Sequence, residues 1–147
     1  MIRAQLMRSD LQLGSGDAVT TSSSAAWDLM DCDYAVLDVI VGVRFHASTG
    51  ATVLSVLTSD DTVVTNHATV VANQTITPGS TTKLVRFLMD TRASKRYLRL
   101  TTAPAGTVAT QDAVVHSAVL HKFRNRVDAD AAADLTASTN DTVVQVG

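Results

Sequence analysis

The chain has 147 residues and a formal net charge of −2 at pH 7, and aromatic residues make up only 4% of it. A chain of this length predicts a single domain whose core is large enough to fold without disulfide bonds or metal ions. The small net charge argues against a broad electrostatic surface for nucleic acid. The scarcity of aromatic residues argues against stacking platforms for bases or sugars.

No segment approaches the roughly 20 consecutive apolar residues of a membrane-spanning helix, and Met1–Arg8 has no apolar run long enough for a signal peptide. We therefore expect no membrane partner. The single cysteine, Cys32, cannot form a disulfide bond within the chain, which fits a reducing cytosol. We interpret it as a small buried hydrophobic residue rather than a nucleophile. All 14 acidic residues are aspartate, which favours turns over helix interiors.

The stretch from Tyr34 to Phe45 carries the strongest structural pattern, and the rest of the chain is expected to be organised around it. Every second residue is apolar along one face, which comprises Ala35, Leu37, Val39, Val41, Val43 and Phe45. The opposite face mixes apolar residues with Asp38, Gly42 and Arg44. A period of two with one unbroken apolar face is typical of a strand packed on a core, and the β-branched content supports this prediction.

Further strands are predicted over Thr52–Thr58, Lys83–Asp90, Arg96–Thr102 and Ala113–Phe123. The last of these is apolar on both faces over most of its length, which predicts a central position in a sheet. The turn at Ala47–Gly50 predicts an antiparallel hairpin between the strands on either side of it. Thr62–Ala72 is ambiguous between a strand and a short helix or irregular loop. Turns are expected at Ser59–Asp61, Thr77–Ser80 and Ala103–Thr107.

Several short strands separated by regular turns indicate an all-β protein. We expect a single β-sandwich, jelly-roll-like or immunoglobulin-like, with extended N- and C-terminal arms. The N-terminal arm or edge segment is expected over residues 1–26, the sandwich domain over residues 27–123 and the C-terminal arm over residues 124–147. Within the first arm, Met1–Asp10 is expected to form a short helix or an extended arm, and Ala18–Ala26 a loop or an edge strand.

The C-terminal arm changes character along its length. Asp128–Asp134 has little side-chain bulk and predicts an extended linker or a helical turn, whereas Thr142–Val146 regains the character of a strand. A compact domain rarely ends in a long structureless tail. We favour the interpretation that the terminal strand docks on a neighbouring subunit by strand addition. The alternative is that it packs on its own domain.

Trp27, the only tryptophan, is expected to fill the core or anchor an interface rather than to stack on a ligand. Seven of the twelve lysines and arginines lie between Arg92 and Arg126, and the segment beyond them is acidic. Local charge balance is the simplest explanation of this asymmetry. The alternative is a docking surface for an acidic partner, or for the Asp-rich tail of a neighbouring subunit.

The sequence displays no strong catalytic or metal-binding motif. His116 and His121 are five residues apart, which on a strand places them on opposite faces. No Gly-x-Ser-x-Gly elbow marks a hydrolase, and Gly14-Ser15-Gly16 is too short to cradle a phosphate. Asp60-Asp61 is interpreted as a turn, with weak calcium ligation as the alternative. We therefore expect no enzyme activity, no cofactor and no metal.

Three segments, Asp33–Gly42, Leu54–Asp61 and Arg96–Leu100, resemble parts of the small head decoration (cement) proteins of tailed bacteriophages. The shared features are a tyrosine followed by an apolar strand and a glycine, and a basic Arg-Tyr-Leu-Arg strand. The resemblance covers roughly Trp27–Phe123. It implies a virion protein, made in the host cytoplasm, that sits on the capsid exterior as a homo-oligomer, commonly a trimer. Such a protein bridges capsomers of the major capsid protein and has no catalytic residues.

This role fits the arms and strands expected above, because a lattice multiplies weak contacts by avidity. The arginines are expected to contact an acidic capsid surface or the tail of a neighbour. Alternative functions are a phage tail or neck component, and a carbohydrate-binding sandwich, for which aromatic residues are few. The candidate interface residues are Trp27, Arg92, Arg96, Arg99, Arg124, Arg126, Val143, Val144 and Val146.

Overall fold

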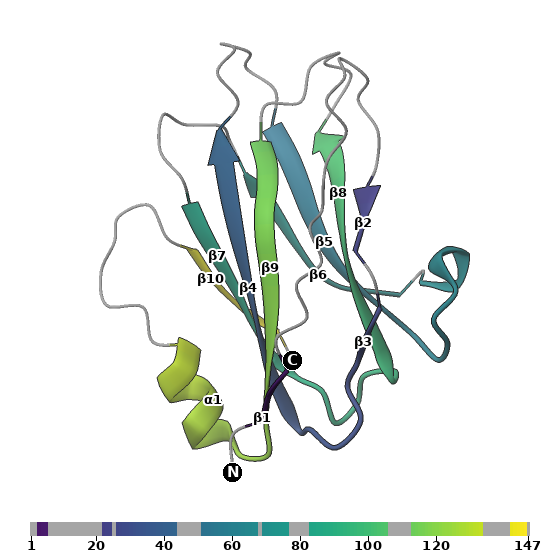
Figure 1. Cartoon of the computed structure of the whole chain (residues 1–147), viewed down its shortest axis with the longest axis vertical. Helices are drawn as coiled ribbons and strands as arrows, with labels where there is room; N and C mark the ends of the chain where they lie inside the picture. The colour runs from purple at the N-terminus through teal and green to yellow at the C-terminus, as the bar shows by residue number, and fades with distance from the viewer. Residues whose placement is uncertain are drawn as a thin grey trace.

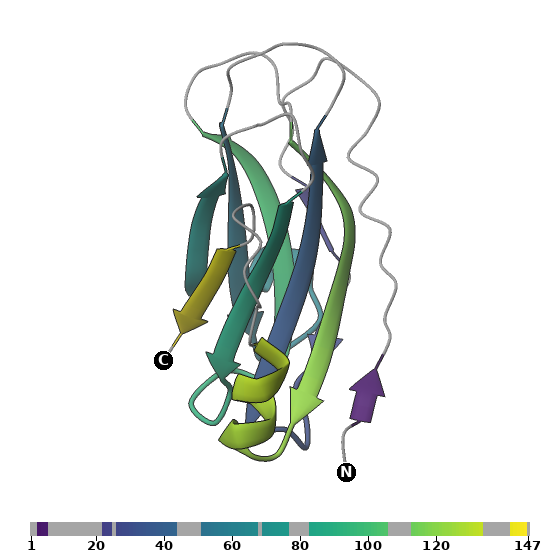
Figure 2. The ribbon, with the colours of Figure 1, turned by 90° about the vertical axis from the view of Figure 1, so that its left-hand side faces the viewer.

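The computed structural model of the chain shows two β-sheets packed face to face, with one short α-helix against the outside of one sheet (Figure 1). It describes residues 3–5, 22–24, 26–43, 51–67, 69–76, 83–105, 113–133 and 142–146. The all-β sandwich predicted from the strand pattern is confirmed. Figure 2 shows the two layers from the side, with the helix on the outer face of the first sheet.

The first sheet has the order β1-β9-β4-β7-β10. All its neighbours are antiparallel except β10, which runs parallel to β7. These strands are β1 (Arg3–Gln5), β9 (Ala113–Phe123), β4 (Tyr34–Val43), β7 (Lys83–Asp90) and β10 (Thr142–Val146). β9, for which a central position was predicted, lies beside the central strand β4, and on its other side β1 pairs with it only at Leu120, His121 and Lys122.

The second sheet has the order β2-β8-β5-β6, and β3 also pairs with β8. All its pairs are antiparallel. Its strands are β2 (Ser22–Ser23), β8 (Tyr97–Ala105), β5 (Ala51–Ser59), β6 (Thr69–Ile76) and β3 (Trp27–Asp28). A short 3₁₀ turn, η1 (Val64–Asn66), precedes β6, so the ambiguous stretch over Thr62–Ala72 contains both an irregular turn and the beginning of a strand.

The main core lies between the sheets and is organised around β4, as the alternating pattern predicts. Ala35, Leu37 and Val39 are fully buried on its inner face. The facing sheet contributes Leu54 and Val56 of β5, both also fully buried. Trp27 is only 1% exposed and joins this cluster, which confirms that it fills the core. Period-two alternation produces this arrangement because successive side chains on a strand point to opposite faces.

The outer face of β4 is also partly buried, which the sequence pattern does not predict. Helix α1 (Arg126–Ala133) covers it, and Ala129 of the helix packs with Val36 of β4 in a second apolar cluster. The other buried members of this cluster are Leu88 and Phe123. The central strand is therefore covered on one face by the second sheet and on part of the other by the helix.

Helix α1 lies in the stretch where an extended linker or a helical turn was expected. Its start is capped by Asn125, whose Oδ1 accepts a hydrogen bond from the backbone N–H of Asp128 at 2.8 Å. In return, the Asn125 side-chain amide donates to the Asp128 carboxylate, also at 2.8 Å. Asparagine is among the preferred N-cap residues, and an acid in the first turn complements the helix dipole. The spacing of Asn125 and Asp128 was thus a local signal for a helix.

Two predictions about the β4–β5 and β8 regions are wrong. Ala47–Gly50 does not join a hairpin, because β4 and β5 belong to different sheets, although residues 47–50 themselves lie outside the described residues. A turn signal specifies that the chain reverses, and it does not specify which sheet the next strand joins. The turn expected at Ala103–Thr107 begins too early, because β8 continues to Ala105 and Pro104 lies opposite Thr52 of β5.

The chain ends also depart from expectation. β10 pairs with β7 of its own chain, with Val144 opposite Phe87, so the alternative in which the strand packs on its own domain is the one observed. Val144 is half-buried against the main core, a contact that explains this placement. Arg3–Gln5 forms an edge strand in the region expected to be a helix or arm, and Ser22–Ser23 forms an edge strand, one of the two alternatives expected for Ala18–Ala26. The remainder of residues 1–21 lies outside the described residues.

Substitutions on the two faces of β4 test this placement of the core. Leu37→Ala removes a fully buried side chain and should lower the free energy of unfolding by about 2–5 kcal/mol. Ile40→Ala on the same strand removes a side chain that is 40% exposed and should cost no more than about 1 kcal/mol. Urea denaturation measures both. Equal losses for the two variants would contradict the assignment of the inner face.

Candidate interaction surface

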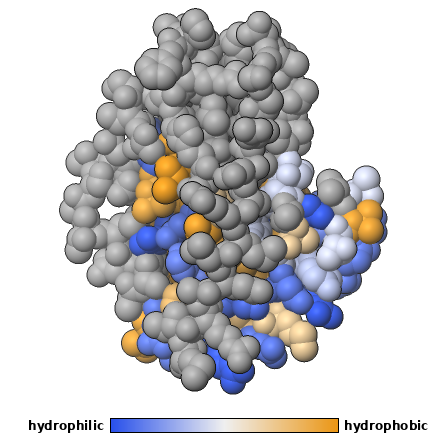
Figure 3. All heavy atoms as spheres, in the orientation of Figure 1, coloured by the Kyte–Doolittle hydropathy of each residue, from blue (hydrophilic) through white to orange (hydrophobic). Residues whose placement is uncertain are grey.

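Charged side chains gather at the end of the sandwich where β4 begins and β7 and β9 end. Tyr34 of β4 lies opposite both Asp90 and Phe123, so these strand ends are neighbours. We call the surface formed by residues 28–33, 59–62, 90–96 and 122–128 the charged end; it occupies the lower part of Figure 1. Figure 3 shows hydrophilic and hydrophobic side chains interleaved over this lower part of the molecule. The charged end contains Arg92, Arg96, Arg124 and Arg126 of the predicted interface.

A tight turn between β3 and β4 forms one rim of the charged end. Asp28 accepts a hydrogen bond from the backbone N–H of Met30 at 2.9 Å, and Asp31 adopts a left-handed backbone conformation with φ of 66°. Aspartate tolerates this conformation better than most residues. The ammonium of Lys122 donates to the carbonyl oxygens of Asp28 and Met30, both at 3.0 Å. The lysine thus fixes the turn to the end of β9, and its ammonium group is hydrogen-bonded within the protein.

Arg96 is held over this turn by a two-point contact with Asp28. Its Nε and Nη2 donate to the two carboxylate oxygens at 3.1 and 2.9 Å, and its guanidinium lies 5.1 Å from the centre of the Tyr97 ring. The hydrogen bond from Arg96 is the main cause that lowers the pKa of Asp28. The same bond raises the pKa of Arg96. The planar fork of arginine matches a carboxylate in this way, and lysine does not.

Arg92 makes a similar arrangement on the neighbouring turn. Its Nε donates to Asp90 Oδ1 at 2.9 Å, its Nη2 bonds Oδ2, and its guanidinium lies 5.1 Å from the centre of the Tyr34 ring. Hydrogen bonding from the Arg92 side chain, followed by its backbone N–H, lowers the pKa of Asp90 from 3.8 to about 2. Asp90 in turn raises the pKa of Arg92. Both tyrosine rings of the chain are therefore covered by arginine.

Arg124 lies just before α1, Arg126 is its first residue and Asp128 lies in its first turn, and all three are exposed. Lys95, also at this end, forms an ion pair with Asp60 at 3.2 Å. Two exposed apolar side chains accompany these charges, Met30 at 56% and Val127 at 77%. Positively and negatively charged side chains therefore alternate over the charged end. The fold places aspartates beside basic residues that cluster in the sequence, and these aspartates offset much of their positive charge.

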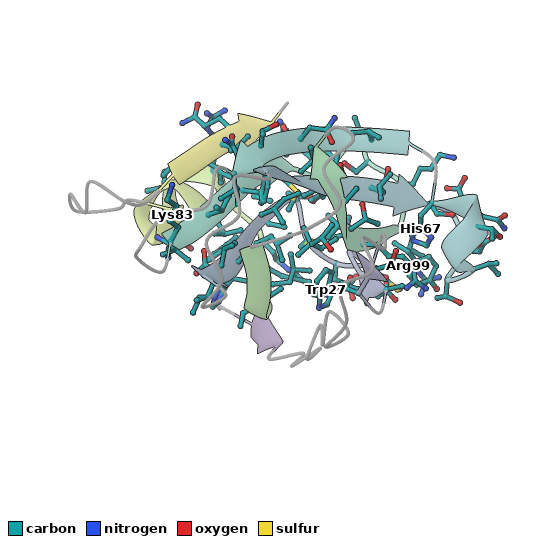
Figure 4. All side chains as sticks on the ribbon, turned by 90° about the horizontal axis from the view of Figure 1, so that it is seen from above. Trp27, His67, Lys83 and Arg99 are labelled. Carbon is teal, nitrogen blue, oxygen red and sulfur yellow. The ribbon has the colours of Figure 1, made fainter. Side chains whose placement is uncertain are left out.

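Arg99 is a correction to the predicted interface, because its side chain does not lie on the surface. The residue is only 7% exposed, and its two terminal nitrogens bond the carbonyl oxygens of Ser24 and Thr62. Figure 4 labels Arg99, which comes from β8, together with His67 and Trp27. Arg99 thus links the segment before β3 to the loop after β5 across strand β8. Its charge is used to hold the fold rather than to meet a partner.

The loop that Arg99 contacts is itself ordered by short-range hydrogen bonds. Asp61 accepts bonds from the backbone N–H of Val63 at 2.8 Å and from the Asn66 side chain at 2.7 Å. These bonds, with that of Asn66 the larger cause, lower the pKa of Asp61. His67 is buried and its Nδ1 bonds the carbonyl oxygen of Val63 at 2.9 Å. Asp61 is therefore a turn-forming residue, as the sequence predicts.

A charged cluster that sequence reasoning missed lies in the middle of the first sheet. Asp38 of β4 accepts two hydrogen bonds from Arg86 of β7, at 2.5 and 2.9 Å, and lies 3.6 Å from His121 Nε2 of β9. The side chains of Arg86 and Asp38 are 14% and 19% exposed. The alternating pattern places Asp38 on the outer face, but nothing local to either strand indicates that Arg86 lies beside it.

The three valines predicted to contact a neighbour all belong to β10. Val143 is 42% exposed and faces outward, whereas Val144 packs partly on the core. Val146 lies opposite Met89 of β7. Trp27 is excluded from the surface by its burial. Of the predicted interface, the described surface therefore includes Val143 and the exposed arginines, at two separate places.

The described residues contain no group of three or more His, Cys, Asp or Glu side chains arranged to hold a metal ion. Cys32 is partly buried beside Leu29 and Thr91, and burial raises the pKa of its thiol. His116 is the extra residue of a β-bulge in β9, where the pairing with β4 shifts. The bulge interrupts the regular alternation from which His116 and His121 were expected to lie on opposite faces of the strand.

No helix in the described part of the chain has the length and apolar character needed to span a bilayer.

No protein-family model matches the chain, and a search of curated proteins finds no significant sequence relative.

Arg99→Lys tests the structural role of the buried guanidinium. A lysine cannot donate to Ser24 and Thr62 in the fixed fork geometry, so we expect the free energy of unfolding to fall by about 1.5–3 kcal/mol. Chemical denaturation provides the measurement. The control is Arg96→Lys, an exposed arginine three residues earlier, which should leave stability almost unchanged. If the control were the more damaging change, the assignment of Arg99 as the structural arginine would be wrong.

The Asp90–Arg92 pair predicts a specific acid dependence. Because folding lowers the pKa of Asp90 from 3.8 to about 2, its stabilising contribution is present above pH 3.8 and is lost as the pH falls through about 2. The melting temperatures of the wild type and Asp90→Asn should therefore converge over this range, and added salt should shrink their difference. Introducing Asp90→Asn into an Arg92→Gln background should remove the effect. A pH-independent difference would refute the ion pair.

Proposed function

We propose that this chain is a structural protein of a virion, a head decoration protein that binds the outside of a bacteriophage capsid and bridges its capsomers. In this proposal the β-sandwich is a rigid body and its role is adhesion, with no catalytic step. The observation that carries the proposal is the charged end, where side chains of both signs are held in fixed positions beside exposed apolar residues.

The charged end has the composition of a protein-binding surface. Arg92 and Arg96 are fixed by carboxylates and by tyrosine rings, so little side-chain freedom remains to be lost on binding. Met30, whose sulfur lies 3.6 Å from Arg96 Nη2, and Val127, which follows Arg126, provide exposed apolar area at the same end. Protein interfaces combine an apolar centre with arginine-rich polar contacts in this way. A surface of alternating sign also favours a partner with a complementary charge pattern over a uniformly acidic one.

The resemblance to decoration proteins supports the same proposal. Its three segments, Asp33–Gly42, Leu54–Asp61 and Arg96–Leu100, fall mainly on β4, β5 and β8, the central strands of the two sheets. The basic Arg-Tyr-Leu-Arg strand begins at the charged end, with Arg96 exposed and Arg99 buried. The resemblance thus covers the framework together with one element of the proposed binding surface.

A carbohydrate-binding function is less well supported, because the aromatic rings in the described residues have other roles. Trp27, Phe87 and Phe123 are buried in the two apolar clusters, and Tyr34 and Tyr97 lie under arginines. Sugar-binding platforms require an exposed ring face. A weak protein contact repeated many times on a lattice matches the charged end better, because avidity makes a strong single interface unnecessary.

The abundance of the chain in purified virions tests the proposed role. A decoration protein should be present at hundreds of copies per particle, and a cryo-EM map should place it on the outside of the head. Gel densitometry against the major capsid protein measures the copy number. A few to a dozen copies would indicate a tail or neck component instead, and absence from the particle would overturn the proposal.

Charge reversal tests the surface. Combined Arg124→Glu and Arg126→Glu should weaken binding to heads assembled without this chain by about tenfold, because each change introduces like-charge repulsion or removes an attraction at the interface. The matched control is Lys83→Glu at the opposite end of β7, which should bind like the wild type. Co-sedimentation with undecorated heads measures both. Equal binding by the double variant and the wild type would show that the charged end is not the contact surface.

A further inference from the structure

The edges of the two sheets differ in how they are protected from pairing with another chain. An exposed edge strand presents unpaired backbone groups, and soluble proteins protect such edges with charges, bulges, prolines or very short strands. In the first sheet, β1 has only three residues, one of them Arg3. In the second sheet, β2 and β3 have two residues each, and β6 contains a bulge near Val71, where its register with β5 shifts.

β10 has none of these protections. It is the last strand of the first sheet, and within the described residues β7 is its only sheet partner. Its sequence, Thr-Val-Val-Gln-Val, contains no charge, proline or glycine, and four of its five residues are β-branched. Val143 is 42% exposed on the outer face, and Gln145 is exposed beside it on the same face. The far edge of β10 thus has the properties of a strand that accepts a further strand.

We propose that two copies of this chain associate through this edge, with β10 of one copy pairing antiparallel to β10 of the other. This inference goes beyond the function proposed above and does not depend on it. The strand is self-complementary in this arrangement: pairing centred on Val144 places Val143 opposite Gln145 of the second copy and Thr142 opposite Val146. Opposed residues share a face and no charges of like sign meet, which favours a twofold contact.

The size of the contact sets its expected strength. A five-residue strand pair buries less than the roughly 1,200 Å² typical of stable complexes, so the association should be weak and depend on concentration. The first sheet would then continue without a break across both copies. Because the two strands are identical in sequence, the contact closes on itself and forms a dimer rather than an open chain.

Sedimentation velocity of the purified full-length chain over a wide concentration range tests this proposal. The wild type should show a reversible monomer–dimer equilibrium. Val143→Lys places a charge on the exposed face of β10 and should raise the dissociation constant at least about tenfold. The matched control, Val127→Lys, changes another exposed valine, on α1, and should dimerise like the wild type. A wild type that stays monomeric throughout, or a Val143→Lys variant that dimerises normally, would overturn the proposal.

A charge-pairing experiment tests the register and does not rely on one variant folding well. One variant has Val143→Lys with Gln145→Lys, and the other has Val143→Asp with Gln145→Asp. Each alone places like charges opposite each other and should be monomeric, with circular dichroism confirming the β fold. Their mixture places lysine opposite aspartate and should restore the dimer. If the mixture stays monomeric, the antiparallel β10 contact is refuted.

Discussion

The burial of strand β4 on its inner face and on part of its outer face is the constraint on which the rest of the fold depends. On its inner face, Leu37 and Val39 meet the second sheet, and on its outer face Val36 meets helix α1 through Ala129. β7 and β9 pair with it along nearly its whole length. The same strand therefore fixes the spacing of the two sheets, the position of the helix and the place where the strand ends converge to form the charged end.

Some charged side chains in this protein hold loops in place, and others lie exposed on the surface. The guanidinium of Arg99 is buried and joins the segment before β3 to the loop after β5, and Lys122 braces the turn at Met30. The exposed Arg92 and Arg96 are each fixed by an aspartate. Individual exposed ion pairs contribute little to stability, but they restrict where these side chains can lie. The charged end is thus organised before any partner arrives, which is the physical basis of the proposed adhesive function.

The sequence predicted most of the strands, but it did not predict which strands and loops contact each other. The alternation along Tyr34–Phe45 identified β4 and its inner face, because a period of two is a local property. The separation of β4 and β5 into different sheets could not be read from Ala47–Gly50, since a turn signal carries no information about sheet membership. The bond between Asp38 and Arg86 joins residues 48 positions apart. Such contacts depend on strand order, which periodicity does not determine.

The predicted interface shows the same difference between local patterns, which the sequence displays, and long-range contacts, which it does not. The clustered basic residues Arg92, Arg96, Arg124 and Arg126 lie at one end of the molecule, but the aspartates that offset Arg96 and Lys95 come from other turns. Arg99 was assigned to the interface because it lies among the basic residues that cluster between Arg92 and Arg126. In the fold, its side chain is buried and bonds the loop that contains Thr62. A local signal for α1 was present in the spacing of Asn125 and Asp128 and would have favoured the helix over a linker.

Native-state hydrogen exchange, followed residue by residue, tests the central position of β4 most directly. The account predicts that amide groups in the middle of β4 exchange only through global unfolding, with a free energy equal to that obtained from denaturation, while those of β1 and β10 exchange through smaller openings. Exchange of β4 through a local opening, with β5 and β8 still protected, would contradict it.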